Sequence, residues 1–340
     1  MKLGIEFNHG FMLEDDTLET VFRRAKAIGA QGGQFKNPMY LSKTLDTVEL
    51  REVKAMADEI GVYIALGLGR INPYNTSEAS SVWQLGGGSY KRGCERIIEA
   101  AASIGCHDLV SQTGGWRGYT LPQPFNTDRF REDVSWDDQL EATAKFLKAL
   151  SPALRACGST ISVETHEEIT SHEVLALIER VGADVVSATL DTGNAVARGE
   201  DPVAAARRLG PHIRQLHVKD VLLFKTEKGF LRNVRPAGDG VIDFAAIAAI
   251  LREKSPDALW NIEDHMGEMF IEYKDAFWRS MHPDLSEDEV SELERMAVAS
   301  AGKIASGAIT APEEYEKISF DRLCMGRIET AIKHLRPILC

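Results

Sequence analysis

The sequence predicts an α/β fold, a (β/α)8 TIM barrel with a C-terminal helical extension. The chain has 340 residues, and such barrels commonly form one domain of about 250 residues or more. Short apolar runs typical of strands alternate with longer segments of helical periodicity, and this alternation favours a parallel, closed sheet. We therefore expect a catalytic barrel in residues 1–280 and a helical extension in residues 281–340.

The first half of the chain predicts four strands and four helices. In the first helix, Leu18, Val21 and Phe22 recur at helical spacing, and Gly29 follows as a C-terminal stop. The expected strands are Lys2–Phe7, Gly32–Phe35, Val62–Leu68 and Asp108–Gln112. The expected helices are Thr17–Ile28, Thr47–Ile60, Ser89–Ile104 and Trp136–Cys157, and a long polar loop occupies residues 113–135.

The second half predicts the remaining four strands, which are short apolar runs with a polar side chain at or near the end. These strands are Thr160–Glu164, Val185–Asp191, Ile213–Val218 and Ala258–Glu263. The helices between them are Ser171–Val181, Pro202–Leu209 and Phe244–Glu253. A long interval separates the last two strands, and it leaves room for a long loop. Helical segments at Ser286–Ser300 and Pro312–His334 form the expected extension.

Composition limits the partners and the compartment. The formal net charge is −12 and no basic block stands out, so a phosphate backbone would be repelled. The five cysteines are odd in number and widely spaced, which argues against a disulfide framework and indicates a reducing compartment. The N-terminus lacks the apolar core of a signal peptide, and no apolar run approaches the roughly 20 residues that span a bilayer. We expect a cytoplasmic protein that binds neither nucleic acid nor a membrane.

Metal-binding side chains occur at the ends of four successive strands. These residues are Glu164, Asp191, His217 and Glu263, and the carboxyl ends of the strands form the active-site face of a TIM barrel. Three carboxylates and one neutral imidazole carry a charge of about −3, which is costly to bury without a cation. Oxygen-rich ligation with one imidazole favours Mn²⁺, with Mg²⁺ or Co²⁺ as alternatives, and leaves Zn²⁺ open. The sequence therefore predicts a divalent metal site.

Five segments resemble the xylose-isomerase-like barrel superfamily, which includes sugar isomerases and epimerases, inosose dehydratases and one family of apurinic endonucleases. The segments are ISVETHE (Ile161–Glu167), LDTGN (Leu190–Asn194), QLHVKD (Gln215–Asp220), RPAGDGVIDF (Arg235–Phe244) and NIED (Asn261–Asp264). By resemblance to the epimerase branch, the two glutamates, Glu164 and Glu263, bind the metal and exchange substrate protons. Asp191 and His217 match the two remaining ligands. The resemblance implies proton abstraction next to a sugar carbonyl.

Two features depart from the ketose 3-epimerases. Asn194 stands where those enzymes typically have a histidine, and no arginine follows soon after the strand-seven histidine, where Lys219 and Lys225 are the nearest cations. The Thr165–His166 pair, the chain length and the helical tail resemble the large subunit of bacterial C-glycoside deglycosidases, which cleave 3-oxo-glycosides together with a small β-rich subunit. That resemblance implies that His166 is the base. An isomerase or epimerase is thus the leading hypothesis, and a lyase such as a C-deglycosidase subunit or an inosose-type dehydratase is the alternative.

Two other classes fit less well. A DNA-repair endonuclease on this barrel needs further histidines for a multi-metal cluster and a basic face, and a binding subunit without catalysis would not need the ligand set. We expect a sugar or glycoside as the substrate, and a homo-oligomer or a complex with a small second subunit. The candidate substrate-binding residues lie near strand ends or in loops, where a purely structural role is the alternative for each. They are His9, Gln34, Lys36, Gln112, Trp116, Asn194, Lys219 and Arg235.

Overall fold

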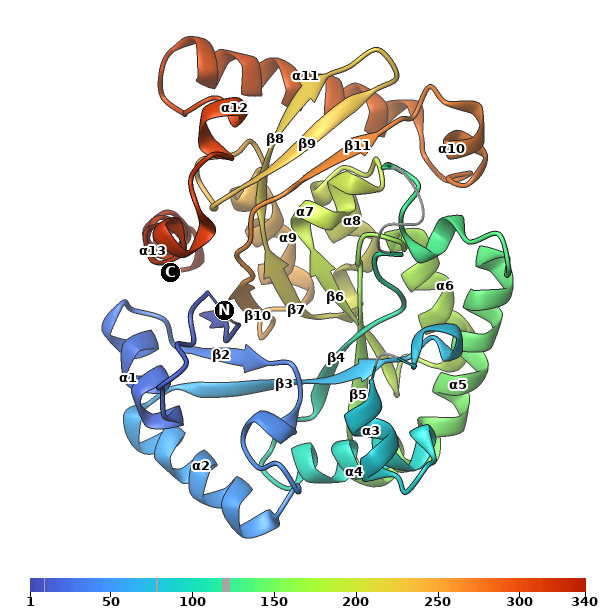
Figure 1. The fold of residues 1–340 in the computed structure, drawn as a ribbon, viewed down its shortest axis with the longest axis vertical. Coiled ribbons are helices and arrows are strands. Elements are labelled where there is room, and N and C mark those ends of the chain that lie inside the picture. Colours follow the sequence, from blue (N-terminus) through green and yellow to red (C-terminus); the bar gives the residue numbers. More distant parts are fainter. Residues whose placement is uncertain (9, 78, 118–122) are drawn as a thin grey trace.

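The computed structural model describes residues 1–8, 10–77, 79–117 and 123–340. Eight parallel strands close into a barrel in the order β1-β10-β7-β6-β5-β4-β3-β2, which confirms the predicted fold class (Figure 1). The barrel strands are β1 (Lys2–Glu6), β2 (Gly32–Phe35), β3 (Tyr63–Arg70), β4 (Asp108–Gln112), β5 (Thr160–Glu164), β6 (Val186–Asp191), β7 (Ile213–Val218) and β10 (Leu259–Ile262).

Amphipathic helices cover the outside of the barrel. They are α1 (Leu18–Ala27), α2 (Thr47–Ile60), α4 (Tyr90–Ala102), α5 (Trp136–Cys157), α6 (Ser171–Val181), α8 (Pro202–Leu209) and α9 (Phe244–Lys254). Local sequence fixes their ends: Thr170 and Glu173 form a capping box at the start of α6, and Gly61 ends α2 in the left-handed conformation (φ 79°). The inward face of α1, with Val21, Phe22 and Ala25, is fully buried in the core.

Several short elements lie in the connections at the strand ends. The short α-helices are α3 (Ser80–Leu85) and α7 (Thr192–Ala197). The 3-10 turns are η1 (Pro38–Tyr40), η2 (Pro73–Asn75), η3 (Asp128–Phe130) and η4 (Gly210–His212). Helix α7 begins directly after β6 because the Asp191 side chain caps it, accepting a hydrogen bond from the Asn194 amide at 2.8 Å.

A small antiparallel sheet replaces the long loop expected after strand seven. It consists of β8 (Asp220–Lys225), β9 (Phe230–Arg235) and β11 (Glu268–Ile271) in the order β11-β9-β8. Val221, Leu222 and Leu223 of β8 are fully buried, and Val221 and Leu223 belong to the same hydrophobic core as the barrel strands. Only Lys219 separates β8 from β7. The apolar run of β8 therefore followed the apolar run of β7 without a turn signal that would mark a new strand.

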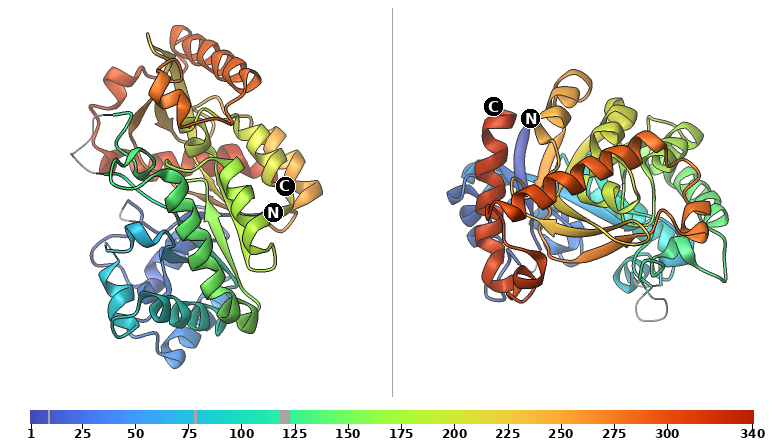
Figure 2. Two further views of the ribbon diagram at one scale, coloured as in Figure 1. Left: turned by 90° about the vertical axis from the view of Figure 1, so that its right-hand side faces the viewer. Right: turned by 90° about the horizontal axis from the view of Figure 1, so that it is seen from above.

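The helical extension is present and packs on the barrel (Figures 1 and 2). It comprises α10 (Ala276–Ser280), α11 (Glu287–Ala305), α12 (Pro312–Tyr315) and α13 (Phe320–Leu339). Helix α11 covers β8, where Ser300 Oγ accepts a hydrogen bond from the Leu223 amide at 2.9 Å. Helix α13 packs against β1 and α9, so the two chain ends lie close together (Figure 2). The division of the chain at residue 280 stays a prediction.

Two further observations concern the whole of the described chain. None of the described helices combines the length and the apolar character that a membrane span requires. All five cysteines are free thiols, and three of them are buried.

Candidate metal centre and active site

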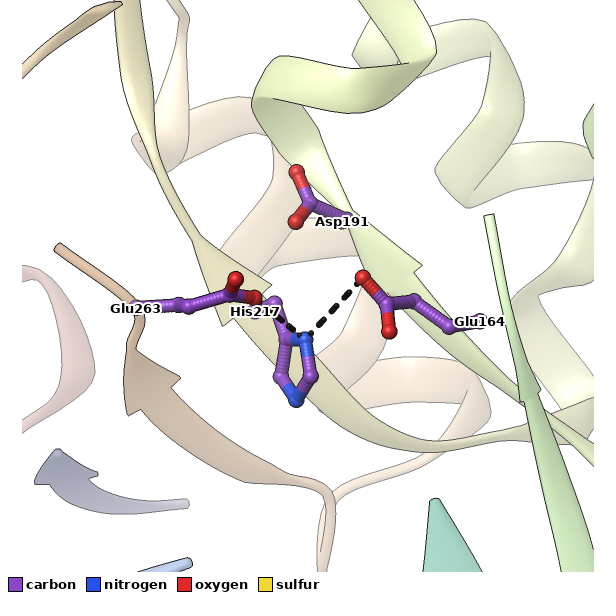
Figure 3. Close-up of side chains that lie close together, drawn as sticks. All are labelled: Glu164, Asp191, His217 and Glu263. Carbon is purple, nitrogen blue, oxygen red and sulfur yellow. Dashed lines mark ion pairs between the residues drawn. The ribbon is translucent and has the colours of Figure 1, made fainter. Parts of the chain in front are cut away.

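Four strand ends bring Glu164, Asp191, His217 and Glu263 together at the barrel mouth (Figure 3). One ligand atom from each residue lies within 4.8 Å of the other three. The strand register contributes to this arrangement. Asp191, the last residue of β6, pairs with His217, which stands one residue before the end of β7. Glu164 and Asp191 are fully buried and His217 is 2% exposed, so the cluster is shielded from bulk water.

The facing atoms of the cluster have no hydrogen-bond partners. They are Glu164 Oε1, Asp191 Oδ2, His217 Nδ1 and Glu263 Oε2. His217 Nδ1 lies 2.6 Å from Glu263 Oε2 and 3.3 Å from Glu164 Oε1, in close contact but without hydrogen-bond alignment. Buried polar atoms that stay unpaired are costly and call for an explanation such as an ion. Three carboxylates and one imidazole are a donor set that suits a divalent cation.

Neighbouring side chains hold the ligands in place through their outer atoms. Gln112 Nε2 donates to Glu164 Oε2 at 3.1 Å, and Gln34 Oε1 lies 3.0 Å from His217 Nε2. Because the Gln34 oxygen only accepts, His217 Nε2 donates to it, and Nδ1 is the ring nitrogen that faces the cluster. The predicted residues Gln34 and Gln112 thus contact the cluster directly.

Lys219 balances part of the negative charge. Its Nζ lies 2.7 Å from Asp191 Oδ2 and 2.9 Å from Glu263 Oε1, and the side chain is 2% exposed. Three carboxylates and one ammonium leave a charge of about −2, which one divalent cation would neutralise. Without such an ion, burial raises the pKa of Asp191 to about 6 against the attraction of Lys219. Burial opposes protonation of His217, but the nearby Glu164 and Glu263 raise its pKa well above the ordinary value.

His166 belongs to a separate dyad beside the cluster. Its Nδ1 lies 2.5 Å from Glu168 Oε2, and Glu168 Oε1 accepts a hydrogen bond from Thr113 Oγ1 at 2.8 Å. Burial lowers the pKa of His166, but the attraction of Glu168 and Glu164 outweighs it and raises the pKa to about 9. Glu168 is fully buried and fixes the ring, so Nε2 is the nitrogen left for a substrate.

Two cavities open beside the cluster. The first, of about 330 Å³, is named the Gln34 cavity, and the second, of about 400 Å³, is named the His166 cavity. The predicted residues that line the Gln34 cavity are Gln34, Lys36, Gln112 and His217. Those that line the His166 cavity are Trp116, His166, Asn194, Lys219 and Glu263.

Two predicted substrate residues, His9 and Arg235, are not among the described residues of this site. His9 lies outside the described residues. Arg235 is 1% exposed, stacks on Tyr315 with 3.8 Å from its guanidinium carbon to the ring centre, and donates from Nε to Asn233 at 2.6 Å. It is absent from the described residues that line either cavity. Arg235 thus anchors β9 to α12.

Three further residues belong to the site, and two of them, Glu6 and Glu168, were missed by the sequence analysis. Glu6 lines the Gln34 cavity at the end of β1, and the rule that found Glu164, a carboxylate closing a barrel strand, applies to it equally. Arg232 lines the His166 cavity and pairs with Glu167 at 2.6 Å. It lies on β9, in the segment read as a loop, so the sequence carried no signal for its position. Glu168, the partner of His166, had a signal only in its position two residues after that histidine.

The sequence model of the xylose isomerase-like TIM barrel matches residues 22–297. The chain belongs to this family. The match covers most of the barrel, and it confirms the resemblance inferred from the strand-end motifs. The cluster, the His166 dyad and the two cavities are therefore features of a xylose isomerase-like barrel.

Curated relatives of this family member match over limited segments. They are the uncharacterized protein YihM of Escherichia coli K12 (29% identical over 110 residues, 32% of this chain and 34% of YihM), an inosose dehydratase of Lacticaseibacillus casei (31% over 135 residues, 36% and 45%) and a 3-oxo-isoapionate decarboxylase of Pectobacterium atrosepticum (28% over 116 residues, 34% and 42%). The chain spans less than half of the length of each. These names describe sugar-acting enzymes in two of the three cases.

Solved structures share the xylose isomerase-like fold over most of the chain. A 3-keto-D-glucoside 4-epimerase, YcjR, of E. coli aligns with a TM-score of 0.56 at 18% identity, covering 87% of this chain and 99% of YcjR. D-psicose 3-epimerase of Clostridium cellulolyticum aligns with a TM-score of 0.58 at 16% identity, covering 89% and 97%. The zinc-bound IolI protein aligns with a TM-score of 0.53 at 17% identity, covering 89% and 99%. At these identities the likeness shows the fold alone.

Proposed function

We propose that this xylose isomerase-like protein is a divalent-metal-dependent enzyme that removes a proton next to a sugar carbonyl, in the manner of a sugar isomerase or epimerase. The observation that carries the proposal is the cluster of four buried or partly buried ligand atoms within 4.8 Å of one another, with a charge of about −2, beside two cavities. Glu164, Asp191, His217 and Glu263 would hold the ion, with Mn²⁺ first and Mg²⁺ or Co²⁺ as alternatives. When bound, the ion supplies Lewis-acid polarisation of a sugar carbonyl.

The proton transfers are assigned to side chains of the cluster and the dyad. Glu164 and Glu263 each direct one carboxylate oxygen to the centre, while Gln112 and Lys219 hold the other oxygen. Both glutamates therefore point toward a substrate bound at the centre. Glu164 approaches from the end of β5 and Glu263 from the end of β10, and proton exchange at two positions of a sugar needs two such groups. His166 Nε2, oriented by Glu168, supplies a third proton carrier.

A lyase acting on an oxo-sugar is the second candidate, and the His166 dyad favours it. Loss of water or of an aglycone needs a proton for the leaving group as well as a base for the carbon, and His166 lies apart from the two metal-binding glutamates. Inosose dehydratase and 3-oxo-isoapionate decarboxylase among the relatives support this class. A subunit of a C-glycoside deglycosidase belongs to the same class of chemistry.

The remaining parts of the proposal concern the surroundings. Gln34, Lys36, Gln112, Trp116, Asn194 and Lys219 contact the substrate from the walls of the two cavities. The enzyme works on a small sugar or glycoside in the cytoplasm, as a homo-oligomer or with a small second subunit. Light scattering of the purified chain measures its oligomeric state. A monomer that is inactive in the assay below would support the second subunit, and an active oligomer would support the homo-oligomer.

Proton NMR in D₂O tests the chemistry. The Mg²⁺-loaded protein is incubated with free ketoses, inososes and 3-oxo-glucosides. Deuterium incorporation with a new free sugar supports the isomerase or epimerase, and release of water or an aglycone supports the lyase. Glu164→Gln and Glu263→Gln should both abolish the reaction. Full activity in either variant contradicts the assignment of the glutamates.

A further inference from the structure

The segment that follows β10 forms one wall of the His166 cavity. The residues of this segment that line the cavity are Glu263, His265, Met266, Gly267 and Glu268. Glu263 also belongs to the metal cluster, whereas His265 does not. His265 thus presents an imidazole to the cavity from a position two residues beyond a cluster carboxylate.

Side chains of this segment alternate between the cavity and the protein interior. Glu263 and His265 line the cavity. Asp264, between them, is buried and accepts two hydrogen bonds from Arg327 Nε of α13, at 2.8 and 3.0 Å. Such alternation is that of an extended chain. Because Asp264 is anchored on the interior side, its two neighbours are held toward the cavity.

Arg327 also fixes the backbone at His265. Its Nη2 donates to the His265 carbonyl oxygen at 2.7 Å, and its Nη1 donates to Tyr315 Oη at 2.5 Å. The guanidinium is itself buried, with 3% of the residue exposed, and its planar fork fixes the geometry of these contacts. The C-terminal extension therefore holds His265 in place, and a side chain held in this way loses less conformational entropy when a ligand binds.

The hydrogen bond of the His265 ring leaves one ring nitrogen for a ligand. Nδ1 lies 2.9 Å from the carbonyl oxygen of Met266. A carbonyl oxygen only accepts, so Nδ1 carries the hydrogen, and in the neutral ring Nε2 has a lone pair. His166 on the same cavity differs, because its Nδ1 contacts the carboxylate of Glu168. His265 therefore offers the cavity a hydrogen-bond acceptor.

We propose that His265 is a specificity-determining residue of the His166 cavity, and that its Nε2 accepts a hydrogen bond from one hydroxyl group of the substrate. This inference rests on the proposed function for the presence of a polyhydroxylated ligand beside Glu263. A hydroxyl group can donate to Nε2, whereas an ether or ketone oxygen cannot. An analogue that lacks this hydroxyl binds more weakly, since Nε2 then has no donor.

A double-mutant cycle between protein and ligand tests this contact. The probes are 1,5-anhydroglucitol and its 2-, 3-, 4- and 6-deoxy derivatives, which have no carbonyl and do not react. His265→Phe keeps a planar ring but removes the acceptor, and His265→Gln keeps an acceptor in its amide oxygen. His107→Phe is the matched control. His107 precedes β4 at the opposite end of the barrel, and its Nδ1 also contacts a backbone carbonyl, that of Cys157 at 3.1 Å.

Calorimetric titration of the Mg²⁺-loaded protein should show that one deoxy derivative binds about tenfold more weakly than the parent ligand. His265→Phe should bind the parent as weakly as that derivative, while His265→Gln and His107→Phe should keep the difference. The inference is overturned if His265→Phe keeps the difference or if His265→Gln loses it. Equal affinities of all the ligands for the wild type, or no binding of any of them, overturns it as well.

The role of His265 and the proposed reaction can fail separately. If the binding pattern holds but no oxo-sugar exchanges its proton, the proposed reaction fails and the role of His265 stands. If an oxo-sugar exchanges its proton but His265→Phe keeps the discrimination between the ligands, the reaction stands and the role of His265 fails.

Discussion

Replacement of Glu164 by Gln tests the metal site through stability, without any substrate. Glutamine keeps the shape and the contact with Gln112 but removes one charge from the cluster. The attraction between a divalent ion and a carboxylate 4 Å away is about 8 kcal/mol at an effective dielectric constant of about 20. Removing the charge also relieves repulsion from Asp191 and Glu263. A net loss of about 3 kcal/mol weakens metal binding by about 100-fold.

The corresponding change in melting temperature follows from the chain length. An unfolding entropy of about 2.1 cal/mol/K per residue gives about 0.7 kcal/mol/K for 340 residues. Mn²⁺ at 100 times its Kd stabilises the wild type by about 2.7 kcal/mol, which raises Tm by about 4 °C. At the same concentration the variant gains about 0.4 kcal/mol, and its Tm rises by less than about 1 °C.

Differential scanning fluorimetry of chelated protein, with Mn²⁺ added back in steps, measures both shifts. Glu168→Gln is the matched control, because Glu168 follows the same strand and is equally buried but lies outside the cluster. Its Tm should rise with Mn²⁺ as much as that of the wild type. The reasoning is refuted if Glu164→Gln keeps the full rise, or if Mn²⁺, Mg²⁺ and Co²⁺ all leave the wild type unchanged.

Two further substitutions separate the dyad and the lysine from the metal ligands. Glu168→Gln should lower kcat by roughly 10²-fold with little change in KM, because His166 loses the carboxylate that orients it; an unchanged kcat in steady-state kinetics would remove the dyad from the mechanism. Lys219→Met should destabilise the metal-free protein by roughly 3–5 kcal/mol, a fall in Tm of about 4–7 °C, since two buried carboxylates lose their partner. Saturating Mn²⁺ should restore most of that loss, and equal Tm values for metal-free wild type and variant would contradict the charge balance.

The barrel was predictable because its strands are short apolar runs that alternate with segments of helical periodicity. The hairpin after β7 was not, because β8 follows β7 after Lys219 alone and the two apolar runs merge in the sequence. Helix α7 was missed for a related reason. Its six residues, Thr192–Ala197, are too few to show helical periodicity, and the cap comes from Asp191, which was interpreted as a metal ligand.

The cluster was predictable because strand ends meet at one face of a barrel, so that position alone brings Glu164, Asp191 and His217 together. Residues on the added sheet followed no such rule. Arg232 and Arg235 lie three positions apart on β9, so that the first lines the His166 cavity and the second stacks on Tyr315 from the other face of the strand. The alternation of a strand distinguishes the two arginines, but the strand itself was not predicted from the sequence. Metal binding and the catalytic roles of these residues stay predictions until they are measured.

The most direct test of the account combines metal content and proton exchange in one titration. Chelated protein receives Mg²⁺ in steps, bound metal is measured by elemental analysis, and exchange of the α-proton of an oxo-sugar is followed by NMR in D₂O. The account predicts that exchange is absent without metal, rises with occupancy and reaches its maximum at one ion per chain. Exchange at an undiminished rate in verified metal-free protein would contradict it.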